Sequence, residues 1–363
     1  MNLTEWEIHL QLKRLLDSCQ TLPLKKKDKY VIFSDLHIGN RTSRDDFNRN
    51  GEMLTRVLKE HYFPQGYTLI LNGDIEELQK FSINLIYERW RDFFDAVMEF
   101  KKKNRLIKLI GNHDLELQAH PKVGINEGLI EGLRFSWNGH TIFMVHGHQA
   151  SGLFTKYNWF VGGILKYLAY PLHIKNRSAA HDSKRKYMVE KRIYKFSEQM
   201  GILSIIGHTH RPLFESHSKR DSLRFSIEIL LRDYPDMSKK QKGETRTKIE
   251  HLREELSNLS KKERKGFKTP SFYNENILLP CLFNSGCAIG KRGMTGIELT
   301  GECITLVHWF DRSKKIKKYW EKGPVYAHPE SNIRKRIINE DQLGYIFNRI
   351  TLLSPGKGLM DKD

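Results

Sequence analysis

The residues best suited to chemistry fall into five short clusters of aspartate, histidine and asparagine. In chain order the clusters are Asp35 with His37, then Asp74, then Asn112 with His113 and Asp114, then His146, and finally His208 with His210. Carboxylates supply charge and can bridge two ions, imidazoles supply neutral nitrogen, and an amide oxygen is a weak neutral ligand. Two neighbouring divalent cations require this mixture. Because oxygen is combined with imidazole, the set suits Mn, Fe or Zn better than Ca.

No cluster is specific by itself. An Asp-x-His sequence occurs by chance in many chains, Gly-Asp carries little information, and an isolated histidine such as His146 is more often structural than a ligand. The Gly-His-x-His sequence at 207–210 is moderately specific. The full set is more informative, because each cluster directly follows an apolar run of strand type. We therefore interpret the five clusters as parts of one metal site.

The apolar runs predict five strands, at residues 30–33, 67–71, 106–110, 141–145 and 202–206. Segments with helical spacing lie at residues 3–19, 47–61 and 83–103. Strands that alternate with helices indicate an α/β fold, in which sites usually form at the carboxyl ends of strands. Glycine stands beside four of the five clusters and permits tight turns and close backbone approach there.

One interruption of this alternation is predicted as a helical cap over the site, at residues 151–200. It combines an apolar and aromatic run at 157–172 with a strongly basic helical stretch at 184–195. The basic stretch could face anionic lipid. The alternative is that the aromatic run simply packs onto the core.

A second interruption is predicted as a charged helical insertion, at residues 215–275, with the densest charge at 233–268. It is either a partner-binding element or a solvated helix without a function of its own. Strands should return at 276–284 and 297–310, followed by a basic C-terminal tail, residues 312–363. We expect all these parts to belong to a single domain, residues 1–363.

The composition favours anionic partners, because the formal net charge is +18 at pH 7. Phosphorylated substrates, nucleic acid and an acidic membrane face all remain open on this ground. None of the four cysteines forms a C-x-x-C pair, so a zinc ribbon is excluded. No apolar stretch reaches the ~20 residues that span a bilayer, and residues 1–16 lack the apolar segment of a signal peptide. We therefore expect a cytoplasmic protein, with peripheral contact to the inner face of the membrane left open.

The clusters together resemble the calcineurin-like metallophosphoesterase superfamily, in its bacterial type. That family's pattern is D-x-H, G-D, G-N-H-[DE], H and G-H-x-H, and every part of it is present. The resemblance implies a four-layer sandwich of two mixed β-sheets flanked by helices. It also implies two divalent metal ions. Asp35, His37 and His210 would hold the first ion, Asn112, His146 and His208 would hold the second, and Asp74 would bridge both.

The resemblance also implies a reaction. Water or hydroxide between two ions about 3.5–4 Å apart attacks phosphorus. His113 would protonate the leaving oxygen or stabilise the phosphoryl oxygens, a role typically worth about 10²–10⁴ in rate. Asp114 either orients that histidine or caps a turn. His148, two residues after a predicted ligand, either supports the ligands or lies exposed in a loop.

Departures from the family narrow the substrate. Phosphoprotein phosphatases of this superfamily extend the second motif to G-D-x-x-D-R, whereas this chain has Glu77 and Leu78 at the last two positions. Glu77 could replace the aspartate that orients the catalytic histidine. Leu78 cannot replace an arginine that binds phosphate in a bidentate manner, which argues against a phosphoprotein substrate.

A second resemblance is to UDP-2,3-diacylglucosamine pyrophosphatases, bacterial enzymes with a helical cap that holds acyl chains. It rests on the sequences FSDLH at 33–37 and HTHRP at 208–212, and on the aromatic and basic stretch between His146 and His208. It implies a lipid-linked substrate and peripheral membrane contact. Two features depart from it, because that family usually has arginine where His113 stands and lacks an insertion like 233–268.

The leading prediction is therefore hydrolysis of a phosphodiester or pyrophosphate bond in a small or lipid-linked anionic substrate. A phosphomonoesterase, a nuclease and an inactive metal-binding scaffold are the alternatives. Weak aromatic interleaving among the basic residues makes nucleic acid a less favoured partner, and the complete ligand set argues against a scaffold. Arg41, Arg44 and Arg211 are candidates for binding substrate phosphate, with exposed loop arginines as the alternative. The oligomeric state is left open.

Overall fold

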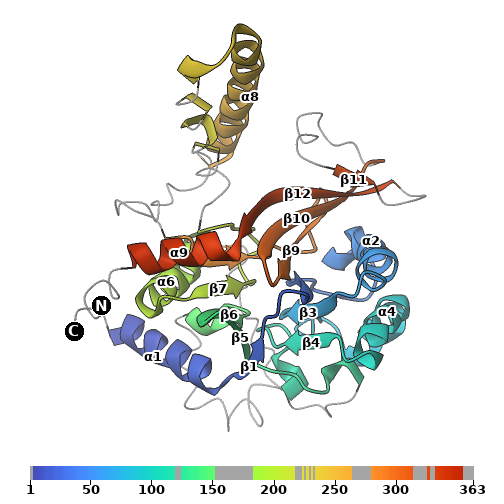
Figure 1. Ribbon diagram of the computed structural model, residues 1–363. Coiled ribbons are helices and arrows are strands. Elements are labelled where there is room, and N and C mark those ends of the chain that lie inside the picture. Colours follow the sequence, from blue (N-terminus) through green and yellow to red (C-terminus); the bar gives the residue numbers. More distant parts are fainter. Residues whose placement is uncertain are drawn as a thin grey trace, which may run out of the picture.

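Two mixed β-sheets form the centre of the molecule, and helices cover them (Figure 1). The computed structural model describes residues 3–118, 124–151, 183–216, 223–224, 226–228, 230–231, 234–263, 279–313, 325–327 and 332–354. The predicted α/β class and the predicted four-layer sandwich of two mixed sheets flanked by helices are confirmed.

The larger sheet has seven strands in the order β11-β12-β10-β9-β2-β3-β4. The strands are β2 (Lys29–Phe33), β3 (Thr68–Asn72), β4 (Leu106–Leu109), β9 (Met294–Thr300), β10 (Cys303–Asp311), β11 (Val325–Ala327) and β12 (Ile333–Gln342). β2, β3 and β4 pair in parallel, so their carboxyl ends lie at one edge of the sheet. The remaining neighbours pair in antiparallel fashion.

The smaller sheet has five strands in the order β1-β5-β6-β7-β8. They are β1 (Gln20–Pro23), β5 (Gly132–Trp137), β6 (His140–Val145), β7 (Leu203–Ile206) and β8 (Leu282–Asn284). β6, β7 and β8 pair in parallel, while β5 and β6 form an antiparallel pair. The carboxyl ends of β6 and β7 therefore also lie together.

Helices bury both sides of this arrangement. The described α-helices are α1 (Leu3–Ser18), α2 (Gly51–Val57), α3 (Ile83–Arg89), α4 (Arg91–Lys102), α6 (Ser183–Met200), α8 (Lys239–Glu263) and α9 (Leu343–Leu353). Of these, α8 takes no part in covering the sheets (Figure 1). Successive side chains of β2 enter different hydrophobic clusters, as expected for a strand covered on both faces. Val31 and Phe33 pack with α2 and α4, whereas Ile32 packs in the cluster that contains the smaller sheet, α1, α6 and α9.

The C-terminal region contributes to the sandwich. Residues 312–363 were expected only as a basic tail, but β12 pairs with β10 and α9 buries four side chains in the core. β12 was difficult to recognise because it carries charged residues on both faces. Two of these, Lys335 and Arg336, are nevertheless buried. Lys335 is neutralised by Glu298 of the neighbouring part of the sheet, through a hydrogen bond of 2.8 Å.

The two predicted interruptions differ in what the structure describes. Within 151–200, α6 packs its apolar side onto the core, whereas residues 152–182, including the aromatic run, lie outside the described residues. Within 215–275, α8 stands away from both sheets (Figure 1). The limits of the cap and of the insertion stay predictions. Among the described helices, none is both long enough and apolar enough to cross a membrane.

Candidate metal centre

The five clusters predicted from the sequence meet where the carboxyl ends of five strands converge. β2, β3 and β4 deliver residues from the larger sheet, and β6 and β7 from the smaller one. Hydrogen bonds connect the two sheets at this point. Nδ1 of His146 lies 2.7 Å from the carbonyl oxygen of Asn72, and His208 N–H donates to Oδ2 of Asp35 over 2.9 Å. We call the seven predicted ligands the strand-end cluster: Asp35, His37, Asp74, Asn112, His146, His208 and His210.

The backbone of this cluster is strained. Positive φ angles occur at Asp35 (54°), His37 (48°), Asp74 (53°), His208 (65°) and His210 (55°). These are five of the ten non-glycine residues with positive φ in the described part of the chain. Such a conformation costs about 1–3 kcal/mol per residue and persists only where the surroundings impose it. The concentration of positive φ angles in the strand-end cluster supports the functional role predicted from the sequence, although the strain itself was not predicted.

Two glycines allow the loops of the cluster to approach closely. A Cβ atom at Gly111 would overlap the backbone nitrogen of Asp74, and one at Gly207 would lie 2.6 Å from Oδ2 of Asp35. Any larger residue would therefore push a candidate ligand out of place. This explains physically why glycine stands beside these clusters in the sequence.

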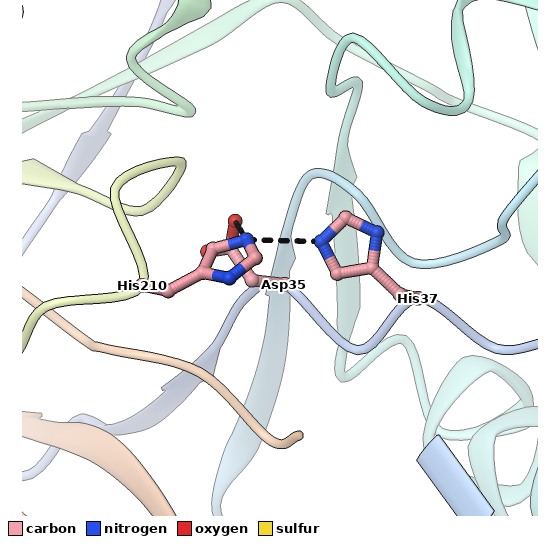
Figure 2. A group of neighbouring side chains, drawn as sticks. All are labelled: Asp35, His37 and His210. Carbon is pink, nitrogen blue, oxygen red and sulfur yellow. Dashed lines mark hydrogen bonds and ion pairs between the residues drawn. The ribbon is translucent and has the colours of Figure 1, made fainter. Parts of the chain in front are cut away.

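Asp35, His37 and His210 form the first group with the geometry of a metal site (Figure 2). One possible ligand atom from each lies within 4.8 Å of the others. Nε2 of His37 lies 3.0 Å from Nε2 of His210, which in turn lies 3.1 Å from Oδ1 of Asp35. Two imidazole nitrogens and a carboxylate oxygen facing one another in this way fit a shared cation.

Asp74, His146 and His208 form a second group that meets the same distance limit. Oδ2 of Asp74 lies 3.2 Å from Nε2 of His146 and 3.9 Å from Nε2 of His37. Asp74 therefore reaches both groups, as a bridging carboxylate must. The structure thus brings the predicted ligands together, while the assignment of each to a particular ion stays a prediction.

Several buried atoms of the site have no hydrogen-bond partner. They are Oδ1 of Asn112, Nε2 of His113 and Nε2 of His208. Oδ1 of Asp35 and Nε2 of His146 have only the imidazole and the carboxylate contact described above, and neither forms a further hydrogen bond. Leaving a buried polar atom unsatisfied costs about 1–3 kcal/mol. Four of these atoms belong to predicted ligands, and their chemistry, two oxygens and two imidazole nitrogens, is that of a Mn, Fe or Zn site. The residues present therefore fit a pair of divalent ions.

The electrostatics of Asp74, His146 and His208 also favour a bound cation. Burial opposes ionisation of Asp74, but the neighbouring histidines, His146 first among them, hold the pKa of its carboxyl well below the usual range. Burial likewise opposes protonation of His146, yet the carboxylates of Asp74 and Asp35 raise its pKa to about 10. Burial and the charge of His146 lower the pKa of His208 to about 3. The two carboxylates thus favour a cation in this pocket, and a bound metal ion would displace the proton.

Glu77 holds two histidines at once. Its Oε2 lies 3.0 Å from Nδ1 of His37, and its Oε1 lies 2.8 Å from Nδ1 of His113. Because each Nδ1 faces a carboxylate, each imidazole carries its proton there and turns Nε2 towards the cluster. Glu77 therefore orients both a predicted ligand and the predicted proton donor. The contact of Glu77 with His113 was predicted from the sequence, whereas its contact with His37 was not.

Asp114 holds the backbone. Its Oδ1 accepts a hydrogen bond from Gly111 N–H over 2.5 Å, and its Oδ2 accepts one from Ile75 N–H over 2.9 Å. Of the two roles considered for Asp114, these contacts favour the structural one. His148 is buried and its ring centroid lies 5.5 Å from that of His146, so it is not an exposed loop residue.

The three candidate arginines occupy different environments. Arg41 donates to Asp92 and Glu52 and stacks over Trp90, with its guanidinium carbon 4.5 Å from the ring centroid. Its guanidinium is therefore engaged away from the cluster. Arg44 is exposed. Arg211 directly follows the predicted ligand His210 and forms an ion pair with the buried carboxylate of Glu190 on α6. A role for any of them in substrate binding stays a prediction.

Glu190 was not singled out from the sequence. It also accepts a hydrogen bond of 2.6 Å from the hydroxyl of Thr209, which lies between two predicted ligands. A signal was available, because Glu190 is a single acidic residue within the basic stretch 184–195. An isolated acid in a basic helix indicates a specific buried partner better than it indicates a solvated surface.

A family model described as calcineurin-like phosphoesterase matches residues 29–212, about half of the chain. The match begins at the first residue of β2 and ends two residues after His210, so it contains all five clusters. No curated protein matches the chain in a sequence comparison.

Proposed function

Because the chain belongs to the calcineurin-like phosphoesterase family, we propose that it is a metal-dependent hydrolase that cleaves a phosphodiester or phosphoanhydride bond at the strand-end cluster. The observation that carries this proposal is the set of buried ligand atoms without hydrogen-bond partners, gathered between two carboxylates. An inactive metal-binding scaffold could use the unsatisfied atoms of the predicted ligands, but it would have no use for the unsatisfied Nε2 of His113, which is the predicted proton donor.

Asp35, His37 and His210 would hold one ion, Asn112, His146 and His208 the other, and Asp74 both. When bound, the ions would acidify water and neutralise negative charge on the phosphoryl oxygens. We expect manganese to support this chemistry, with iron or zinc as substitutes.

The protein's own contribution centres on His113. Hydrolysis joins the oxygen of water to phosphorus, breaks the bond to the leaving oxygen, and requires a proton for that oxygen. Nε2 of His113 is buried and without a hydrogen-bond partner, while Glu77 binds Nδ1. Burial opposes protonation of His113, but the charges of Asp74 and Glu77 outweigh it, so the pKa of this imidazole is raised above its usual value. A protonated His113 can then donate to the leaving oxygen.

The choice of bond rests on the second motif. Leu78 stands where phosphoprotein phosphatases carry arginine, and its apolar side chain packs beside the core. A phosphomonoester brings an additional negative charge that such an arginine would neutralise. Its replacement by leucine favours a diester or anhydride over a phosphomonoester.

A lipid-linked substrate, contact with the inner face of a membrane and a cytoplasmic location remain proposals of lower priority. The first two depend on the aromatic run at 157–172, which lies outside the described residues. Nucleic acid is less favoured than a small anionic substrate, because few aromatic residues are interleaved with the basic residues of this chain and bases would have few rings on which to stack.

The proposal is tested by hydrolysis of bis(p-nitrophenyl) phosphate and of p-nitrophenyl phosphate in the presence of Mn²⁺. We expect the diester to be cleaved with the higher kcat/KM, and Asp74→Asn to lose more than about 10³-fold in kcat, since removing an essential electrostatic group typically costs 10²–10³ or more. Preference for the monoester would redirect the proposal to phosphomonoesters. Equal and negligible rates for both proteins, with Mn²⁺, Fe²⁺ and Zn²⁺ in turn, would contradict it.

A further inference from the structure

Helix α6 carries a charged contact directly beside the strand-end cluster. The side chain of Glu190 is fully buried, whereas that of Arg211 is 37% exposed. Both carboxylate oxygens of Glu190 are used, because Nε and Nη2 of Arg211 donate to different ones. A bidentate pair of this kind fixes the plane of the guanidinium. Arg211 is therefore held in one orientation next to His210, with part of its guanidinium facing solvent.

A second cation lies on the same side of α6. Lys186 precedes Glu190 by four residues, which places the two side chains on one face of the helix, one turn apart. Lys186 is partly buried. Burial lowers the pKa of its ammonium group, while the charges of Glu190 and of Asp35 act in the opposite direction. The ammonium thus lies within electrostatic range of Glu190 and of a predicted metal ligand.

The charges of this group do not cancel. Lys186 and Arg211 carry two positive charges and Glu190 carries one negative charge, which leaves one positive charge beside the cluster. No described residue forms a hydrogen bond or an ion pair with the Lys186 ammonium at contact distance. Two cations so close to one another favour an anionic ligand between them, and partial burial of the ammonium strengthens that preference.

We infer that Lys186 and Arg211, the latter positioned by Glu190, form a subsite for a second phosphoryl group of the substrate. This inference rests on the proposed function and makes it more specific, because a simple phosphodiester has no second phosphoryl group to place there. The substrate class is then a diphosphate ester, with a phosphoanhydride bond at the strand-end cluster. A guanidinium held flat beside an ammonium suits the oxygens of a phosphoryl group.

The reaction on such a substrate is balanced by water alone. The oxygen of water adds to one phosphorus, the bridging P–O bond breaks, and the bridging oxygen departs with the other phosphoryl group. Each product carries one phosphoryl group, as a phosphomonoester where that group was esterified and as inorganic phosphate where it was not. The protons of water are shared between the two products and the solvent. One of the two new phosphates would remain in contact with Lys186 and Arg211 until it is released.

The test compares ADP with AMP, which differ by one phosphoryl group. ADP is used as its α,β-methylene analogue, whose bridging carbon cannot be hydrolysed, so that binding is followed without turnover. We would measure the Kd of each compound by calorimetry on the Mn²⁺-loaded protein at fixed free Mn²⁺. Wild type should bind ADP at least about 10-fold more tightly than AMP, since hydrogen bonds to charged groups are worth about 1.5–3 kcal/mol. Lys186→Met and Arg211→Gln should each reduce this ratio towards one. Lys195→Met removes an exposed charge from the same helix and should leave the ratio unchanged.

Lys186→Met is the more informative variant, because Arg211→Gln could also disturb the loop that carries His208 and His210. An equal ratio in wild type and in Lys186→Met would overturn the inference, as would an equal fall in Lys195→Met. Hydrolysis of bis(p-nitrophenyl) phosphate is measured in parallel. Turnover without selective ADP binding would defeat the subsite alone, whereas selective ADP binding without turnover on any metal would defeat the proposed function alone.

Discussion

Two clusters of buried polar side chains surround Asp74 and Glu76, which lie only two residues apart along the chain. They differ in how many of their polar atoms have a hydrogen-bond partner. Around Asp74, several buried ligand atoms have no hydrogen-bond partner. Around Glu76, pairing is complete, because Nζ of Lys108 donates to both carboxylate oxygens over 2.6 and 2.7 Å and to Asn126 over 2.7 Å. Tyr87 adds a hydrogen bond of 3.2 Å to Glu76.

The degree of hydrogen-bond pairing distinguishes a structural cluster from a functional one better than burial does. Both groups are charged and excluded from solvent, so both are costly to form. The Glu76 group recovers that cost within the protein and can serve as a support. The strand-end cluster does not offset the cost of burial with contacts inside the protein, so a bound ligand such as a metal ion must offset it. Incomplete pairing, combined with strained backbone, therefore marks the functional region.

The largest effect should come from breaking the complete group. Lys108→Met removes the cation from between Glu76 and Asn126 and leaves a buried carboxylate without its partner. Loss of one member of a buried pair costs about 3–5 kcal/mol, so the free energy of unfolding should fall by that amount. Urea unfolding of the metal-free protein measures it, with the exposed Lys102→Met as the matched control. A loss below about 1 kcal/mol, the range of exposed pairs, would show that the group is not a structural support.

The next effect should come from filling the incomplete group. We expect Mn²⁺ to bind the folded chain at the strand-end cluster, so that a free Mn²⁺ concentration of 100 times the Kd should stabilise the protein by about 2.7 kcal/mol. Thermal unfolding with Mn²⁺ and after chelation measures the shift. His146→Ala should abolish most of it, while Lys102→Met should retain it. An identical shift in His146→Ala would place the binding elsewhere.

A smaller effect is expected at Glu77, which lies at the edge of the cluster. Glu77→Gln removes the charge that orients His37 and His113, and substitutions of groups that position metal ligands typically cost about 10–100-fold. We expect such a fall in kcat for bis(p-nitrophenyl) phosphate. The alkaline limb of the pH–rate profile should also move to lower pH, because His113 loses a charge that raises its pKa and is therefore deprotonated earlier. Glu77→Asp should restore part of the rate. An unchanged pH profile with a lower rate would reduce Glu77 to a packing role.

The smallest effect on the free energy of unfolding should come from removing one peripheral hydrogen-bonding group from the cluster around Glu76. Tyr87→Phe removes a hydroxyl that donates to Glu76 and accepts from Nδ2 of Asn126 over 2.7 Å. The free energy of unfolding should fall by about 1 kcal/mol, the net value of one hydrogen bond. Urea unfolding measures it, and kcat should be unaffected. A loss of activity without a loss of stability would connect the two groups functionally.

The sequence was sufficient where local patterns carry the information. Apolar runs that end in aspartate or histidine predicted β2, β3, β4, β6 and β7, and with them the meeting point of the clusters. It was not sufficient where a residue depends on a distant partner. Lys335 of β12 is buried only because Glu298 lies opposite, and Glu190 of α6 is explained only by Thr209 and Arg211.

Backbone strain was also beyond the sequence. The residue types of Asp35, His37 and His208 do not suffice to predict a positive φ, because aspartate and histidine adopt it more often than other non-glycine residues but still only rarely. These angles result from strand ends in two sheets that are brought together over a long separation in the chain. They could be found only from the assembled fold.

The most direct test of the account is the metal content of the purified protein after incubation with Mn²⁺ and removal of free ions. Elemental analysis by mass spectrometry should give two Mn per chain for wild type and fewer than one for Asp74→Asn, because Asp74 reaches both groups. Two Mn per chain in both proteins, or none in wild type, would contradict the claim that the strand-end cluster is a two-metal centre.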